Sequence, residues 1–505
     1  MSLTIGMPAI IILTIIILTI AFSKYSDNLV LYALAAAVSL VGIHIHIGIS
    51  FYLSRIVMIS FLCAASIKYI RGVKTVYATL FLSRFVILFS LIVLFQIIST
   101  LLSPRIPEGI RQVAIHAALM ALFIIVIAVS TNIESIIKAI KIYLGIGLLQ
   151  SIYGIYQVIG GRFNWVTYQK ILTYLNIPTT NDHTSNGYIF SSLYNIFRAL
   201  GFYPADVSHY AGYLVGVIVL AASFLSYNRR LVWTYIIIVF GFCAILLSFS
   251  RSGMLTLLFI GIPALLFLLT FIKRGAAFQV GKLLLMPMLA GVILSYLIFN
   301  AHSLKINLGD AQQTQQTQQT QILEVLVKRY GDIFTNLFQN KIESLNEHDK
   351  DISESLNEHV QTRLAGLKAF SENPFLGVGL GVNASPWTSK DYPRGWGGSH
   401  SYHLDMLGQT GLIGVILQTI FMILVGKYMW MGFNIGEKDD LSRHILAGLM
   451  ASFIAIIIGN FLYAYFTLDI VWFLVGSGVA LSRLRILSET NSIRNKSWCD
   501  VILKV

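Results

Sequence analysis

The chain has 505 residues, of which 56% are hydrophobic and only 12% are charged. Soluble globular domains carry about 25% charged residues, so this composition excludes an ordinary soluble protein and predicts a surface that faces mostly lipid. The net charge of +13 comes largely from short loops between apolar blocks, which argues against a nucleic-acid-binding surface.

Apolar blocks predict membrane-spanning helices, because about 20 apolar residues cross about 30 Å of hydrocarbon, where the backbone must be hydrogen-bonded within the segment. Ten blocks precede a long polar segment, at residues 7–22, 29–48, 51–67, 76–100, 112–130, 134–159, 207–226, 231–249, 253–272 and 283–301. Three follow it, at residues 402–426, 444–465 and 467–482. The expected fold class is therefore an all-α, polytopic integral membrane protein.

Lysine and arginine gather in alternate short loops, which are therefore expected to be cytoplasmic. Thirteen helices then place the N-terminus outside, whereas twelve helices, with two of the first three blocks forming one re-entrant unit, place it inside. The predicted regions are N-terminal transmembrane helices with an outer loop at 160–206 (1–301), an extracytoplasmic segment (302–400), C-terminal transmembrane helices (401–482) and a cytoplasmic tail (483–505).

One segment combines a histidine with a predicted helix start. On a helix that contains His400, the face of this residue would also carry Leu404, Leu407, Gly411 and Gly414, at +4, +7, +11 and +14. Ser399 is a candidate N-cap. The positive end of a helix dipole favours a neutral imidazole, which can accept a proton from a sugar hydroxyl. The simpler interpretation is a histidine that only hydrogen-bonds a loop.

Three arginines, Arg198, Arg251 and Arg363, lie near the predicted outer ends of helices. A single arginine in such a place is more often a snorkelling anchor than a ligand contact. Several outer arginines oppose the positive-inside trend, however, and a fixed anion would explain them. Guanidinium groups bind diphosphate oxygens in a bidentate manner.

In their order along the chain, four segments resemble the O-antigen ligase and Wzy-type polymerase superfamily. They are Arg198 with Gly201; Ser250–Gly253; Asn373 and Pro374 with Gly377, Gly379 and Gly381; and His400–Gly414. The resemblance covers about residues 195–415. One departure is Gln409, where the family often has glutamate.

This resemblance implies a membrane glycosyltransferase of the GT-C type in the bacterial cytoplasmic (inner) membrane, with its active site on the periplasmic or outer face. It implies that His400 is the catalytic base and that Arg198, Arg251 and Arg363 bind the diphosphate of the substrate. The reaction is expected to be inverting and metal-independent, with no cofactor. Further candidates for an acceptor or secondary site are His403, Tyr402 and His209.

The expected partners are an undecaprenyl-diphosphate-linked glycan donor, a lipid-linked glycan or lipid A core acceptor, membrane lipid and a chain-length regulator, but no nucleic acid. The segment 203–211 is more similar to polymerases and favours polymerisation of O-antigen repeat units. An O-antigen ligase that transfers polymer to lipid A core is the first alternative. A polysaccharide transporter or flippase is the second, although the chain shows no paired interruptions of its helices.

Overall fold

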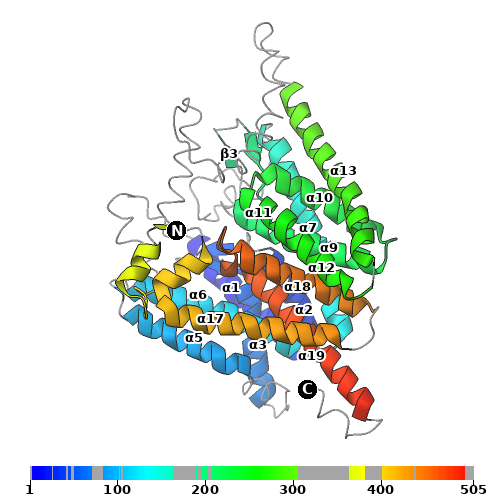
Figure 1. The fold of residues 1–505 in the computed structure, drawn as a ribbon. Helices are drawn as coiled ribbons and strands as arrows, with labels where there is room; N and C mark the ends of the chain where they lie inside the picture. Colours follow the sequence, from blue (N-terminus) through cyan, green and yellow to red (C-terminus); the bar gives the residue numbers. More distant parts are fainter. Residues whose placement is uncertain are drawn as a thin grey trace, which may run out of the picture.

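The chain is almost entirely helical in the part that the structure describes, which confirms the all-α membrane fold (Figure 1). The computed structural model describes residues 3–24, 27–40, 44–46, 50–70, 84–101, 103, 106–162, 189–191, 196–201, 207–273, 275–304, 363–364, 366–380, 401–435 and 440–494. Among them are two short antiparallel hairpins, in which β1 (His44–His46) pairs with β2 (Ser50–Tyr52) and β3 (Ile189–Ser191) pairs with β4 (Ile196–Arg198).

Each of the thirteen predicted blocks overlaps a helix. The first ten correspond to α1 (Leu3–Lys24), α2 (Asp27–Ser39), α3 (Leu53–Ile70), α5 (Arg84–Leu101), α6 (Ile106–Val129), α7 (Ile133–Arg162), α9 (Val207–Tyr227), α10 (Val232–Ser248), α11 (Arg251–Leu255) with η3 (Thr256–Gly261) and α12 (Ile262–Thr270), and α13 (Ala276–Leu304). The last three correspond to α17 (Tyr402–Asn434), α18 (Leu441–Gly459) and α19 (Asp469–Arg494), with the short 3₁₀ helix η5 (Tyr465–Thr467) before α19. Among the described residues, nine helices are long and apolar enough to cross a membrane.

Two blocks are helical over a shorter stretch than predicted, whereas α17 and α19 extend beyond their predicted ends at residues 426 and 482. The block 29–48 is helical only as far as Ser39, and residues 44–46 form a strand. The alternation of histidine and isoleucine in this stretch has the period of two that is typical of strands. The block 444–465 is helical only as far as Gly459, and Asn460 begins a turn. A glycine near the end of an apolar run is a common signal for a helix end.

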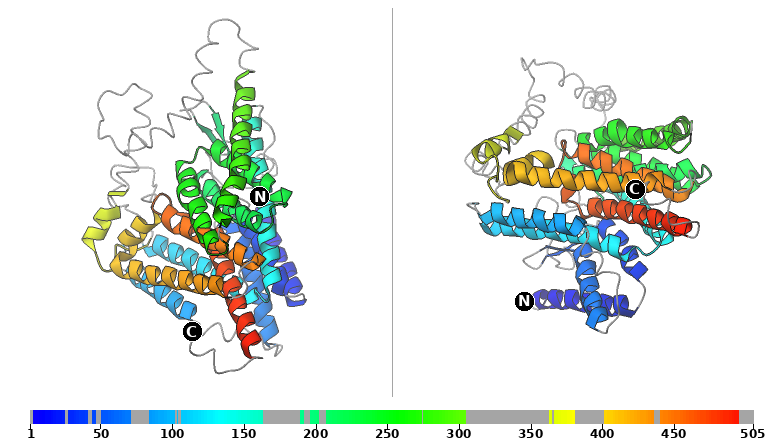
Figure 2. Two further views of the ribbon diagram at one scale, coloured as in Figure 1. Left: turned by 45° about the vertical axis from the view of Figure 1, so that its right-hand side comes forward. Right: turned by 60° about the horizontal axis from the view of Figure 1, so that its bottom comes forward.

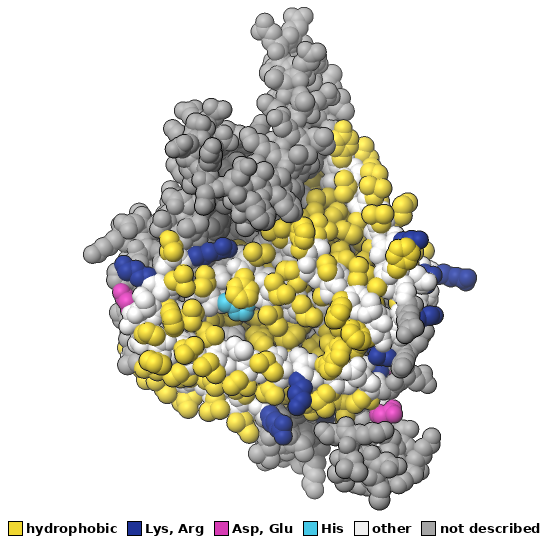
Figure 3. All heavy atoms as spheres, viewed as in Figure 1, with side chains coloured by type: hydrophobic (Ala, Val, Ile, Leu, Met, Phe, Trp, Pro, Cys, Tyr) yellow, Lys and Arg dark blue, Asp and Glu magenta, His cyan; other side chains and the backbone are white. Residues whose placement is uncertain are grey.

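The helices pack in layers, as the right-hand view of Figure 2 shows. Helices α9, α10, α12 and α13 contact one another on one side of the bundle, and α1 packs on α3 on the other. Between them, α17 contacts α5 and α19, α19 contacts α6, and α18 contacts α9. Figure 3 shows a broad hydrophobic surface on which most Lys and Arg side chains in view lie near the edges, as a chain embedded in lipid requires.

The helix ends fall into two groups. We call the site end the one at which α9, α11, α17 and α19 begin and α10 and α18 end. At the opposite end, Arg485 is 3% exposed and ties α19 to the α17–α18 connection, with a 2.7 Å ion pair to Asp440 and a 2.9 Å bond from its Nε to the Gly432 carbonyl. Burial raises the pKa of Asp440, but the hydrogen bonds from Ser442, Arg485 and the Arg443 backbone together hold that pKa below its usual value.

Candidate functional site

The start of α9 holds the Arg198 and Arg251 segments together. Arg198 Nε donates to the carbonyl of Ser248 over 2.9 Å, so β4 is fixed to the end of α10. Gly253, in α11, lies directly against α9, where an added Cβ would come within 2.3 Å of the Ala211 methyl carbon. Arg198 and Arg251 are therefore brought to one region of the site end.

Arg251 is the first residue of α11, and the local hydrogen bonds explain its position. Ser250 is the N-cap, and its hydroxyl accepts from the Gly253 backbone N–H over 3.2 Å. The Arg251 Nε is buried but has no hydrogen-bond partner. A buried guanidinium N–H without an acceptor is costly, and an anionic oxygen would satisfy it. An anionic ligand would therefore supply the acceptor that this side chain lacks among the described residues.

The start of α17 is anchored to the turn after α18. The Tyr402 backbone N–H donates to the Asn460 carbonyl over 3.0 Å, and the Ser401 hydroxyl donates to the same carbonyl over 3.3 Å. The helix begins at Tyr402 with Ser401 in the N-cap position, so Ser399 is not the N-cap that we expected. His400 lies outside the described residues, one position before this anchored pair.

Two of the candidate acceptor residues have their polar atoms engaged inside the protein. The Tyr402 side chain is 6% exposed, and its hydroxyl accepts from Gln418 Nε2 over 2.6 Å. His403 Nε2 lies 2.8 Å from the Ile457 carbonyl, and because a carbonyl only accepts, Nε2 must carry the proton. This nitrogen of His403 is therefore not available as a base.

The third candidate, His209, connects α9 to the same turn. Its ring lies edge-on to Tyr463, with centroids 5.0 Å apart. One turn further along α9, an added Cβ at Gly212 would come within 2.3 Å of the Tyr465 ring. The residues 459–469, which we call the α18–α19 connector, thus join the α17 start to the arginine-bearing side of the bundle. The sequence analysis did not single out Asn460, Tyr463 or Tyr465.

The Asn-Pro segment stabilises a break in α17, and we call the contacts of residues 363–380 with this helix the brace. Gly411 has φ 62° and ψ −166°, so α17 is interrupted there. The Leu412 N–H donates to the Pro374 carbonyl over 2.8 Å, which replaces a helical bond, and the Gly379 N–H donates to the Gln409 carbonyl over 3.0 Å. The expected single helical face from His400 to Gly414 is therefore wrong beyond residue 410, although these glycines do permit the predicted close approach.

Replacing Gly411 by alanine is expected to destabilise the protein and abolish most of its activity. The backbone at Gly411 lies in a region open essentially to glycine only, and forcing another residue there costs about 1–3 kcal/mol. The new Cβ would also lie 2.5 Å from the Phe375 carbonyl. The unfolding temperature in detergent and the rate of glycan transfer measure the two effects.

Gly426→Ala is the matched control in the same helix, since its Cβ would meet only Phe453 at 3.8 Å. This variant should unfold at or above the wild-type temperature, because alanine is the better helix former. Equal unfolding temperatures and equal transfer rates in Gly411→Ala and Gly426→Ala would contradict the conclusion that the break at Gly411 is needed for stability and activity.

Arg363 belongs to the same brace. It lies one helical turn before Gly366, whose carbonyl would be 2.9 Å from an added Cβ at Gly408 of α17. Like that of Arg251, the Nε of Arg363 is buried without a hydrogen-bond partner. The structure thus places Arg363 beside the first turns of α17. Gly381 lies outside the described residues.

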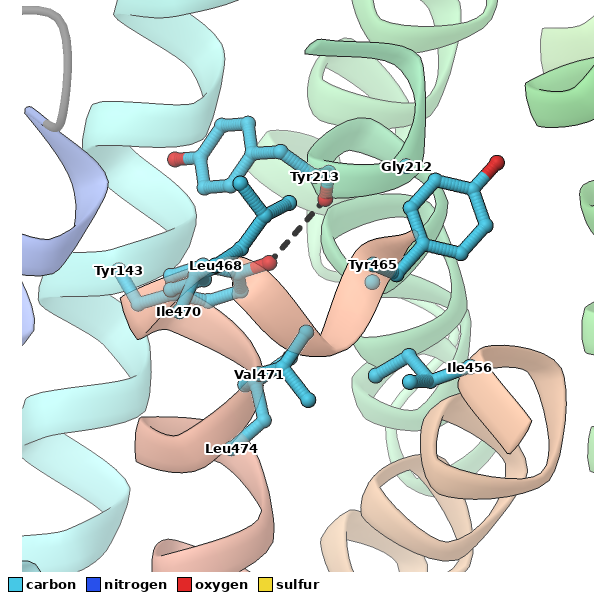
Figure 4. A pocket seen from close by; sticks show the side chains of 10 residues that line it. Tyr143, Gly212, Tyr213, Ile456, Tyr465, Leu468, Ile470, Val471 and Leu474 are labelled. Carbon is cyan, nitrogen blue, oxygen red and sulfur yellow. Dashed lines mark hydrogen bonds between the residues drawn. The ribbon is translucent and has the colours of Figure 1, made fainter. Parts of the chain in front are cut away.

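A small apolar cavity lies between α7, α9, α18 and α19 (Figure 4). The Tyr143 hydroxyl donates to the Tyr213 carbonyl over 3.2 Å at its wall, and Tyr465 borders it on the other side. About 10 Å³ is open to the centre of a water molecule, which is room for roughly one water. This cavity is too small for a sugar, so a glycan must bind elsewhere.

Comparison with protein families gives one match, to the family described as O-Antigen ligase, over residues 236–418. The match extends from α10 into α17, so it includes Arg251, the Asn-Pro segment and His400, whereas Arg198 precedes it. It confirms the resemblance to the superfamily and supports a membrane transferase. No curated protein matches the chain.

Proposed function

We propose that this protein polymerises lipid-linked repeat units of O-antigen or a related surface polysaccharide. The observation that carries the proposal is that two buried guanidinium Nε atoms, those of Arg251 and Arg363, have no acceptor among the residues that the structure describes. Both belong to segments that position the start of an O-antigen ligase family helix. A diphosphate supplies the oxygens that such groups bind best.

In the proposed reaction, His400 takes the proton of an acceptor sugar hydroxyl. The hydroxyl oxygen attacks the anomeric carbon of the donor glycan, and the bond from this carbon to the diphosphate breaks. The electron pair leaves with the diphosphate, and Arg198, Arg251 and Arg363 stabilise the charge that develops on it. A single displacement of this kind inverts the anomeric centre, and arginine can stabilise the leaving group without a metal.

The proposed site faces the periplasm or the outside of the cytoplasmic membrane. The opposite end carries basic residues such as Lys68, Arg229 and Arg485, which favours the cytoplasmic side for that end. The donor glycan would then be attached to undecaprenyl diphosphate in the outer leaflet, near the start of α17.

The segment 203–211 favours a polymerase over a ligase. In the structure, the last residues of this segment pack close to the proposed donor site. The Tyr210 hydroxyl donates to the Gln150 carbonyl over 2.9 Å, and Ala211 packs directly against Gly253, two residues after Arg251. The description of the matched family favours the second candidate, a ligase that transfers finished polymer to lipid A core.

A deletion strain separates the two candidates. If the protein is the polymerase, surface core should carry a single repeat unit, because ligation proceeds without elongation. Bare core, with long polymer retained on the lipid carrier, would instead establish the ligase. Complementation with the intact gene should restore the parental pattern in both cases.

A further inference from the structure

A second basic group lies at the site end, on α3 and α6. The Arg55 guanidinium stacks 4.5 Å from the centroid of the Tyr52 ring, and Arg111 is exposed on α6. Both charges act on Tyr52: burial raises the pKa of its hydroxyl, and Arg55 and Arg111 oppose that rise. Neither arginine forms an ion pair with any residue that the structure describes.

Asp469, a buried acidic residue of this region, joins α3 to α19. Its carboxylate accepts a hydrogen bond from the Ser54 hydroxyl, and the residue is 7% exposed. The carboxylate therefore fastens the first turn of α3 to the start of α19, and it also attracts the Arg55 guanidinium without forming an ion pair with it. Among the described residues, no carboxylate lies within ion-pair distance of either arginine, so both can bind an added anion.

The start of α17 lies between this group and Arg251. Along the α18–α19 connector, Tyr463 contacts His209 on the Arg251 side, and Asp469 bonds Ser54 on the Arg55 side. Tyr402 packs between these points, with its ring 5.2 Å from that of Phe466. Ser401 and Tyr402, the first described residues after His400, therefore lie between two separate cationic groups.

We propose that Arg55 and Arg111 bind the diphosphate of the lipid-linked acceptor, while the Arg251 group binds that of the donor. The inference rests on the proposed polymerase function, in which both substrates are anionic lipids. Two diphosphates side by side repel each other, and separate cationic groups on either side of the base keep them apart. Stacking on Tyr52 orients the Arg55 fork, which a bidentate contact with phosphate oxygens needs.

The test uses the full chain in nanodiscs with two defined substrates. The donor has its accepting hydroxyl methylated, so it cannot accept. The acceptor has its anomeric oxygen replaced by methylene, so its glycan cannot be transferred. For the double variant Arg55→Ala/Arg111→Ala, we expect the KM for this acceptor to rise about tenfold or more, as the loss of a charged contact predicts. The turnover at saturating acceptor and the KM for the donor should stay near wild type.

Three comparisons make the result specific. A soluble acceptor glycan without lipid and diphosphate should react equally with wild type and variant, and Arg55→Lys should recover part of the loss. Lys368→Ala, which removes an exposed charge from the brace beside α17, should leave the acceptor KM unchanged. The wild-type KM should be the same in phosphatidylcholine and phosphatidylglycerol nanodiscs.

An unchanged acceptor KM in the double variant, with wild-type transfer intact, would overturn the inference and leave the polymerase function standing. A defect that appears only in phosphatidylglycerol would also overturn it, because the arginines would then bind a membrane headgroup. Wild-type protein that glycosylates lipid A core and not the lipid-linked acceptor would refute the polymerase function itself.

Discussion

Replacing His400 by alanine is expected to slow glycan transfer by roughly 10²–10⁴-fold, the usual contribution of a general base, while donor binding stays near wild type. The residue directly precedes Ser401 and Tyr402, which are both fixed to the Asn460 carbonyl. The two residues that follow the proposed base are therefore fixed to the turn after α18. Single-turnover rates and donor affinity, measured on the same purified preparation, check the two halves of the expectation.

His403 is the competing base and gives the control. Its Nε2 donates to the Ile457 carbonyl, so His403→Ala should lower the unfolding temperature more than it lowers the chemical rate. A folded His403→Ala enzyme without activity, beside an active His400→Ala enzyme, would move the base to His403. Full activity in both variants and in the double variant would leave arginine electrostatics as the only catalysis.

The second large effect is expected at Arg251. Arg251→Ala should weaken donor binding and also reduce turnover, together by about 10²–10³-fold, because the same guanidinium binds the diphosphate and stabilises its leaving charge. The buried Nε of this side chain has no protein acceptor, so little internal structure depends on it. Donor binding with purified protein and the transfer rate at saturating donor separate the two contributions.

Arg251→Lys should restore only part of this loss, since an ammonium group cannot reproduce the bidentate fork. Arg230→Ala removes the same charge from an exposed position at the opposite end and should be neutral. Equal defects in Arg251→Ala and Arg230→Ala would indicate a general effect of net charge. Normal donor binding in a folded Arg251→Ala protein would remove Arg251 from the diphosphate site.

Hydropathy was sufficient to place the helices, because lipid demands long apolar blocks with few alternatives. Helix α9 begins at Val207, the residue expected, and both ends of α10 lie within one residue of the predicted block 231–249. The order of motifs also indicated that Arg198 and Arg251 belong together. The structure adds the reason, which is the close packing of Gly253 on Ala211.

The break at Gly411 could not be predicted from periodicity. The residues at +4, +7, +11 and +14 from His400 fit an uninterrupted helix, and the positive φ arises from contacts with Pro374 and Phe375, which are distant in sequence. The role of Asn460 was hidden for a similar reason, because it falls inside an apolar block. Contacts between segments far apart in the chain decide both features, and a single sequence does not display them.

The brace between the Asn-Pro segment and α17 limits which segments of this protein can be exchanged with those of a related protein. Because the carbonyls of Pro374 and Phe375 accept the N–H groups of Leu412 and Ile413, the backbone of the helix is completed by residues that precede it by almost forty positions. An exchange of outer segments between such enzymes would therefore succeed only if the transplanted piece ends before Arg363 or carries its own matching helix. In any such exchange, the chain from Arg363 through the break must be transferred as one unit.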